Sequence, residues 1–254
     1  MISAELTGVL AQRLDTAQTS RRDTPSLADS HEFDIDDAYA VQAALLELRV
    51  GRGERIVGVK LGFTSKAKMA QMGVSDVIVG RLTDAMRIAD GDEVDLSRFI
   101  HPKVEPEVAF RLCRDVDPED PPTEIESCVD AVAPAVEIID SRYRDFRFTY
   151  TDVVADNTSA AGYAIGPWRA VADVANRAVR LRTAATETVG STAAILGDPV
   201  HALHALLDMC RRRGISLKAG QVVLAGAATA AVPLVAGVTE CDVAGIGSVT
   251  VKGF

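Results

Sequence analysis

The sequence predicts an α+β fold: one β-rich domain with peripheral helices and an N-terminal helical lead-in. Three observations predict it. The chain has 254 residues, 48% of them hydrophobic, which suffices to bury a sizeable core. Apolar residues recur at helical spacing before residue 50, whereas strand-like segments dominate from Val104 onward. No internal repeat or linker is evident, so we expect a lead-in over residues 1–55 and a main domain over residues 56–254.

The lead-in is predicted to hold two helices. Residues 1–22 form the first, an amphipathic helix, and a polar loop over residues 23–32 follows it. Asp34 to Asp37 can cap the second, in which apolar residues recur at helical spacing (Ala38, Val41, Leu45, Leu48). Glycines at positions 51 and 53 end it.

The main domain is predicted to begin with a short apolar strand over Ile56–Gly62 and a helical turn near residues 67–72. A helix is expected near residues 124–132. A second is expected over Pro199–Arg212, because proline is tolerated in the first helical turn. Residues 217–224 are predicted to form a turn followed by a strand, and residues 245–251 a closing strand.

Charge and cysteine usage exclude several classes of protein. The net charge of −9 with no basic patch disfavours a nucleic-acid or anionic-membrane partner. The four cysteines are scattered without a C-x-x-C pair, which is typical of reduced thiols in a cytoplasmic protein. The N-terminus lacks an export signal, and no apolar run approaches the roughly 18 residues needed to cross a bilayer. We therefore expect a soluble cytoplasmic protein.

Three glutamates are the candidate metal ligands. Glu105 and Glu107 are two residues apart in a predicted strand, so their side chains share one face. Glu137 lies in another apolar, strand-like run. Carboxylates so placed repel one another and desolvate poorly unless a cation lies between them. A divalent metal would satisfy all three, and the alternative is a solvated strand face.

Three other charged residues are candidates for catalysis. Lys60 lies between Val59 and Leu61, where burial would depress its pKa unless a carboxylate compensates. The alternative is an amine on the wet face of the strand. Asp84 and Asp156 each follow an apolar run, a place where acids usually cap turns.

Several ordered motifs together carry a resemblance to a known family. They are Val57–Ser65 (VGVKLGFTS), His101–Glu107 (HPKVEPE), Glu137–Arg142 (EIIDSR), Val154–Asn157 (VADN), Leu196–Pro199 (LGDP) and Gly245–Ser248 (GIGS). From about Asp36 to the C-terminus, the chain resembles the hydratase/decarboxylase branch of the fumarylacetoacetate hydrolase superfamily. The resemblance implies a roll of strongly twisted mixed sheets, with residues 56–254 as the catalytic domain.

The resemblance also implies roles for individual residues. Glu105, Glu107 and Glu137 match the positions that hold Mg²⁺ or Mn²⁺, and all-oxygen ligation suits such hard cations. Lys60 matches a site lysine, and further residues are expected at the site (Asp84 and Asp156 as catalytic groups; Arg142, Lys103 and Thr229 as substrate-binding groups). The metal would act as a Lewis acid on a small 2-oxo acid.

The reaction implied first is decarboxylation of 2-oxo-3-hexenedioate, with hydration of 2-hydroxypenta-2,4-dienoate as the alternative and a non-catalytic partner subunit as a third reading. The segment Lys66–Val74 and three aromatic residues (Tyr143, Phe146, Phe148) favour the decarboxylase. Gly162 weighs against it, because decarboxylases of the branch often carry an arginine at this position, shortly after the Ala-Asp-Asn motif. The family also implies a homo-oligomer and an association with a paralogous hydratase.

Overall fold

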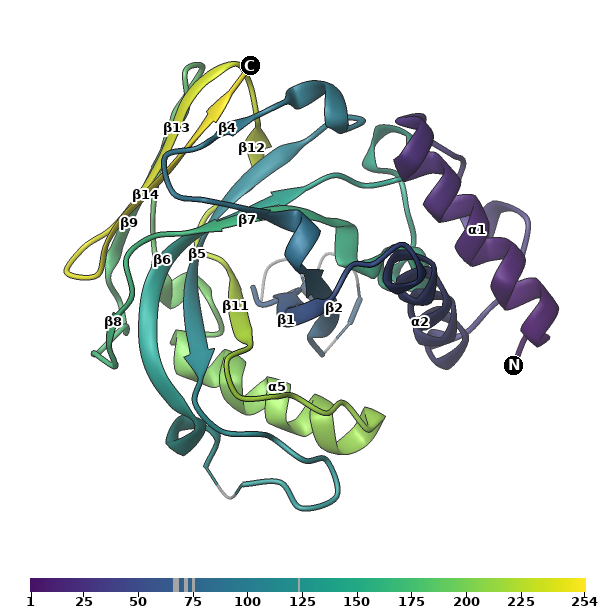
Figure 1. The fold of residues 1–254 in the computed structure, drawn as a ribbon, viewed down its shortest axis with the longest axis horizontal. Helices are drawn as coiled ribbons and strands as arrows, with labels where there is room; N and C mark the ends of the chain where they lie inside the picture. Colours follow the sequence, from purple (N-terminus) through teal and green to yellow (C-terminus); the bar gives the residue numbers. More distant parts are fainter. Residues whose placement is uncertain (66–68, 71–72, 75, 123) are drawn as a thin grey trace.

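A computed structural model describes residues 1–65, 69–70, 73–74, 76–122 and 124–254 (Figure 1). Two curled sheets make up the main domain, with α5 packed beside them and α1 and α2 at one side (Figure 1). The predicted α+β class of twisted mixed sheets with peripheral helices is confirmed. None of the described helices combines the length and apolar character needed to cross a membrane.

The larger sheet has the strand order β2-β1-β11-β5-β6-β7-β3, with β12 on β5 and β8 on β6. The smaller sheet has the order β10-β9-β13-β14-β4. The strands are β1 Ile56–Gly62, β2 Ile78–Thr83, β3 Arg87–Ile88, β4 Glu93–Val94, β5 Lys103–Leu112, β6 Val129–Ile139, β7 Ala160–Ile165, β8 Arg169–Ala170, β9 Ala178–Arg182, β10 Glu187–Ser191, β11 Val222–Ala227, β12 Val232–Pro233, β13 Gly237–Val243 and β14 Gly247–Gly253. Parallel pairs (β1 with β11, β3 with β7, β4 with β14) make both sheets mixed.

The long antiparallel strands β5 and β6 form the centre of the larger sheet. Their register runs from Lys103 opposite Ile139 to Leu112 opposite Val129. Nearly every residue of β6 is buried, because other elements cover both faces of the strand (Figure 1). Polar side chains in the middle of these two strands therefore lie inside the protein, whereas Arg111 and Asp130 near one end of the pair are partly exposed.

The two N-terminal helices pack on the main domain through an apolar cluster of their own. Ser3 caps α1 (Ala4–Ser20). The cap predicted for the second helix is confirmed, because Asp34 caps α2 (Ile35–Gly51) in a reciprocal capping box with Asp37. The apolar faces of both helices meet the short helix α4 (Tyr150–Ala155) in a cluster that includes Leu10, Leu14, Val41, Leu45, Ile78, Tyr143 and Val154. Ile78 of β2 belongs to this cluster, so the helices pack against that strand.

Two helix predictions in the main domain have different outcomes. The helix α5 is confirmed over Pro199–Arg213, between the N-cap Asp198 and the C-cap Gly214. The helix expected near residues 124–132 is wrong, because Ile125–Cys128 makes only a 3₁₀ turn and β6 starts at Val129. The apolar, valine-rich run there pairs with β5 instead. The turn predicted at residues 67–72 lies largely outside the described residues.

Candidate metal and substrate site

Strands β5 and β6 bring the three predicted glutamates together. Glu105 and Glu107 project from one face of β5, and the register places Glu137 of β6 directly opposite Glu105. One carboxylate oxygen from each lies within 4.8 Å of the others. The residues are 5%, 1% and 0% exposed, so the alternative of a solvated strand face is wrong.

The negative charge of the three carboxylates exceeds the positive charge that Lys60 brings to the cluster. Burial, followed by the charge of Glu137, holds the pKa of Glu107 well above its usual range. Burial also raises the pKa of Glu137, although Lys60 opposes that effect. Oε1 of Glu107 and Oε1 of Glu137 find no hydrogen-bond partner among the described residues. Buried acceptors without partners are costly, so this cluster is suited to a further cation.

The donor set fits a hard divalent ion. It consists of carboxylate oxygens, which Mg²⁺ and Mn²⁺ prefer, and Oε1 of Glu107 and Oε1 of Glu137 have no partner in the part of the chain that the structure describes. Oε2 of Glu107 accepts a hydrogen bond from the Gly226 backbone at 2.7 Å, whereas its Oε1 has no partner among the described residues. Gly226 has a φ of +111°, and a side chain there would collide with Thr64. The backbone of β11 thus orients one of the three carboxylates.

Lys60 of β1 lies against this cluster. Its Nζ is 3.0 Å from Oε2 of Glu137, and it donates a hydrogen bond to the carbonyl of Thr158 at 3.2 Å. Burial lowers the pKa of Lys60, but Glu137, Glu107 and Glu105 outweigh that effect and leave the pKa raised. The side chain is 4% exposed and charged, so the alternative of a wet-face amine is wrong.

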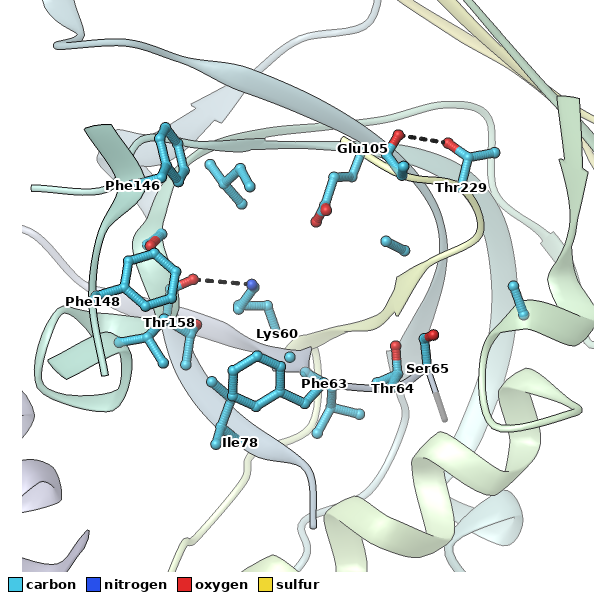
Figure 2. Close-up of a pocket in the computed structure, with 18 residues that line it drawn as sticks. Lys60, Phe63, Thr64, Ser65, Ile78, Glu105, Phe146, Phe148, Thr158 and Thr229 are labelled. Carbon is cyan, nitrogen blue, oxygen red and sulfur yellow. Dashed lines mark hydrogen bonds between the residues drawn. The ribbon is translucent and has the colours of Figure 1, made fainter. Parts of the chain in front are cut away.

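A pocket of about 320 Å³ opens beside the cluster (Figure 2). Aromatic rings of Phe63, Phe146 and Phe148 lie around one part of it, whereas Thr64, Ser65 and Thr229 lie on another (Figure 2). Glu105 and Lys60 are among its lining residues, together with Leu61, Gly62, Ile78, Ile139, Val153, Thr158, Ser159, Ala194, Ala227 and Ala230. A small molecule in this pocket therefore contacts both the carboxylate cluster and a largely apolar wall.

Two of the predicted substrate-binding residues lie at or beside the pocket. Thr229 lines it and donates a hydrogen bond to the carbonyl of Ala230. Lys103 lies on the same face of β5 as Glu105, two residues earlier, and its Nζ is 4.0 Å from the centre of the Phe146 ring. Lys103 is thus separated from the pocket by a residue that lines it.

The structure places the other three predicted residues outside the pocket lining. Arg142 and Asp156 are 1% and 0% exposed and form an ion pair with each other. Arg142 also donates to the carbonyls of Asp140, Ala160 and Asp156. Asp84 follows β2 and accepts hydrogen bonds from the backbone and guanidinium of Arg55. All three are engaged within the protein, so we do not propose that they contact a substrate.

Thr158 and Ser159 also line the pocket, although no sequence pattern indicated them. They come directly after Asn157, the last residue of the Ala-Asp-Asn motif. All three residues, Asn157, Thr158 and Ser159, have a left-handed backbone conformation. Phe63, another lining residue, also has a positive φ, of 56°, and stacks on Tyr150. Asn157 is the one sequence signal for these positive φ angles, because asparagine tolerates the left-handed region better than threonine does.

Comparisons with known proteins identify the family. No family model matches the chain. The chain is 46% identical to a 4-oxalocrotonate decarboxylase from a Pseudomonas species, over 95% of both chains. The chain belongs to the hydratase/decarboxylase branch of the fumarylacetoacetate hydrolase superfamily.

Other members of the branch are similar over almost their full length. A 2-keto-4-pentenoate hydratase from Paraburkholderia xenovorans is 36% identical, over 94% of this chain and 91% of its own. The structure of a 4-oxalocrotonate decarboxylase from Pseudomonas putida G7, complexed with magnesium and adipate, has a TM-score of 0.93. That structure is 33% identical and covers 100% of this chain and 99% of its own. The decarboxylases and hydratases of this branch are lyases.

The residues from which the sequence comparison of the two reactions was argued do not all face the pocket. Phe146 and Phe148 line it, but Tyr143 is fully buried and its hydroxyl donates to the carbonyl of Asp152. Gly162 is paired with Ile138, one residue after Glu137, so a side chain there would point to the apolar face. An arginine at position 162 would not face the carboxylates. Much of Lys66–Val74 lies outside the described residues.

Proposed function

We propose that this protein is a metal-dependent lyase that decarboxylates 2-oxo-3-hexenedioate (4-oxalocrotonate) to 2-hydroxypenta-2,4-dienoate. One observation carries the proposal: three buried carboxylates and Lys60 converge beside a pocket with an aromatic wall. The 46% identity to a 4-oxalocrotonate decarboxylase supports this reaction over hydration. We infer that residues 56–254 supply the catalytic groups, since the pocket-lining residues fall within them.

We infer that Glu105, Glu107 and Glu137 hold Mg²⁺ or Mn²⁺. When bound, the ion would act as a Lewis acid and stabilise negative charge on the 2-oxo group as the distal carboxylate leaves as CO₂. The two carboxylate oxygens without partners are the groups available to it. Gly226 fixes the orientation of one of them through its N–H.

The protein's own groups then divide the remaining tasks. Lys60 carries a raised pKa, so its ammonium can donate a hydrogen bond to an oxygen that gains negative charge. Phe63, Phe146 and Phe148 would pack against the conjugated chain of the substrate and exclude water. Thr229 offers a hydroxyl at the pocket wall, and Lys103 offers a positive charge beside Phe146 for an anionic substrate.

Hydration of 2-hydroxypenta-2,4-dienoate (2-keto-4-pentenoate) is the second candidate. The same carboxylate cluster and Lys60 would serve it, with a base delivering water to the alkene. The 36% identity to a 2-keto-4-pentenoate hydratase supports this second reaction.

The deciding experiment follows two substrates in parallel. Purified protein with Mg²⁺ is incubated with 2-oxo-3-hexenedioate while released CO₂ is measured, and with 2-hydroxypenta-2,4-dienoate while its absorbance is followed. We expect CO₂ release from the diacid. Consumption of the dienoate with no CO₂ from the diacid would contradict decarboxylation and favour the hydratase.

Matched variants test the site in the same assay. Glu107→Gln should abolish metal-dependent turnover, because it removes one proposed ligand and keeps the shape of the side chain. Glu47→Gln is the control, since Glu47 is exposed on α2, outside the pocket lining. Full activity in Glu107→Gln would refute the site. A catalytically inactive partner subunit would show no turnover and need not retain a metal ion in elemental analysis.

We further propose that the protein is cytoplasmic and homo-oligomeric and that it associates with a paralogous hydratase, as the family resemblance implies. The net charge of −9 disfavours nucleic-acid and anionic-membrane partners. Light scattering on the purified protein, alone and mixed with such a hydratase, tests both associations. A monomer in both samples would contradict them.

A further inference from the structure

Lys60 is held by two different elements. Glu137 of β6 attracts its ammonium across 3.0 Å. The backbone carbonyl of Thr158 accepts a hydrogen bond from it at 3.2 Å (Figure 2). The carbonyl is neutral, so it orients the ammonium without adding to the negative charge of the cluster. The position of the Thr158 carbonyl therefore influences where Lys60 lies in the pocket.

That carbonyl belongs to a strained segment of backbone. Asn157, Thr158 and Ser159 have φ values of 47°, 53° and 60°, so three consecutive residues other than glycine are left-handed. L-residues rarely adopt this conformation, and a β-branched residue such as threonine is especially disfavoured in it. Such a segment persists only where its surroundings hold it in place. We call residues 157–159 the left-handed turn.

The side chain of Asn157 attaches the left-handed turn to β2 through two hydrogen bonds. Its Oδ1 accepts a hydrogen bond from the backbone N–H of Arg81 at 2.7 Å, and its Nδ2 donates one to the carbonyl of Arg81 at 2.9 Å. One amide side chain thus clamps both polar groups of a single residue within β2. At the other end of the turn, the carbonyl of Ser159 accepts a hydrogen bond from the backbone of Asp140 at 2.9 Å.

Gly80 makes room for this arrangement. A Cβ atom at position 80 would lie 2.2 Å from Oγ1 of Thr158 and 2.8 Å from the carbonyl oxygen of Asn157. It would also lie 3.1 Å from Cδ of Lys60, which is paired with Gly80 across β1 and β2. The left-handed turn and the Lys60 side chain therefore both pass over the same glycine.

We propose that Asn157 and Gly80 are positioning residues, which hold the left-handed turn on β2 so that the Thr158 carbonyl fixes Lys60 at the carboxylate cluster. This inference deepens the proposed function and rests on it for its catalytic consequence. The geometric part, that Asn157 controls the position of the Lys60 ammonium, is independent of the reaction.

The test removes the clamp without adding backbone strain. Asn157→Gly loses both hydrogen bonds to Arg81, whereas glycine adopts a positive φ readily. Asn176→Gly is the matched control, because Asn176 is also left-handed, with a φ of 46°, but is exposed and bonded to Ser191. We expect Asn157→Gly to lower kcat by roughly ten- to hundredfold with a much smaller change in KM. The control should match the wild type.

A spectroscopic measurement reports on Lys60 directly. The chain has only six lysines, so a ¹H–¹³C spectrum of protein labelled at lysine Cε is simple, and Lys60→Met assigns the relevant resonance. The Lys60 resonance should shift in Asn157→Gly and in Gly80→Ala, with and without Mg²⁺, and stay in place in Asn176→Gly. Gly80→Ala provides the reading if Asn157→Gly fails to fold.

The outcomes separate this inference from the proposed function. An unmoved Lys60 resonance with wild-type kcat in a folded Asn157→Gly variant would overturn the inference, as would an equal response in the control. A wild-type protein with neither lyase activity would refute the proposed function, and the lysine spectra alone would then decide the role of Asn157.

Discussion

The protein buries two clusters of charge that differ in how far their partners satisfy them. In the pair formed by Arg142 and Asp156, the guanidinium meets one carboxylate and three backbone carbonyls. In the carboxylate cluster, Lys60 is the one ammonium that the described residues place against the glutamates, and Oε1 of Glu107 and Oε1 of Glu137 have neither a hydrogen-bond nor an ion-pair partner there. Burial is nearly the same in both, since all these residues are 5% exposed or less.

This difference suggests a structural role for the Arg142–Asp156 pair and a binding role for the carboxylate cluster. A buried ion pair with its hydrogen bonds satisfied is complete without any ligand. Arg142 and Asp156 therefore anchor the chain on either side of three residues that line the pocket, Phe146, Phe148 and Val153. The three carboxylates of the cluster repel one another, and Lys60 compensates only part of their charge. Their arrangement therefore opposes folding and favours the binding of a further cation. The two clusters should therefore respond oppositely to substitution.

The largest expected effect comes from Glu107→Gln. Turnover should fall by more than about a hundredfold, since even residues that only support metal ligands cost 10- to 100-fold when replaced. The metal-free variant should unfold at the same denaturant concentration as the wild type or a higher one, because burial and Glu137 raise the pKa of Glu107. Chemical denaturation measures the second effect. A marked loss of metal-free stability would contradict the comparison.

Replacing one member of the satisfied pair should have the opposite effect on stability. Arg142→Met leaves Asp156 buried without its cation, and breaking such a pair costs about 3–5 kcal/mol of unfolding free energy. The midpoint of denaturation by urea reports the change. Arg144→Met is a suitable control, because Arg144 is largely exposed and pairs with Asp23 at the surface. Equal midpoints in the two variants would mean that the buried pair is not an anchor.

Metal ions should stabilise only a protein whose carboxylate cluster is intact. At a Mn²⁺ concentration 100 times the Kd, binding to the folded state alone adds about 2.7 kcal/mol to the unfolding free energy. Thermal melting with Mn²⁺ or with EDTA should show this rise in the wild type and in Arg144→Met. Glu107→Gln should show little of it. An equal rise in Glu107→Gln would place the binding ion elsewhere.

The smallest effect is a pH dependence at Asp156. Burial raises its pKa from 3.8 to about 6 despite the opposing effect of Arg142. The folded state then binds more protons than the unfolded state between these values, so this contribution is present below about pH 4 and is lost as pH rises through about 6. Relative to Asp156→Asn, the wild type should lose stability over that range. Denaturation at several pH values measures it, and the opposite slope would contradict the assignment.

The sequence carried enough information to predict the carboxylate cluster and not enough to predict the left-handed turn. Alternation along a strand placed Glu105 and Glu107 on one face, and an isolated acid in an apolar run indicated Glu137. The roles expected for Asp84, Asp156 and Arg142 came from the resemblance, and their side-chain directions depend on tertiary contacts that no local pattern encodes. Similarly, the predicted helix at residues 124–132 yielded to pairing with β5.

Lys60 shows where local and tertiary information meet. Its place between two apolar residues predicted burial, and a compensating carboxylate was the stated condition for keeping its charge. The structure meets that condition through Glu137, which is distant in sequence and adjacent in space. Spacing alone could not have revealed that the Thr158 carbonyl is the second partner, because this contact depends on three residues with positive φ.

The central claim is that the unsatisfied carboxylates form a metal site, and a Mn²⁺ titration tests it most directly. Free Mn²⁺ is followed by electron paramagnetic resonance as metal-free wild type, Glu107→Gln and Glu47→Gln are added. The account predicts about one bound ion per chain in the wild type and in Glu47→Gln, with affinity weakened by more than about a hundredfold in Glu107→Gln. Undiminished affinity in Glu107→Gln, or no binding by the wild type, would contradict it.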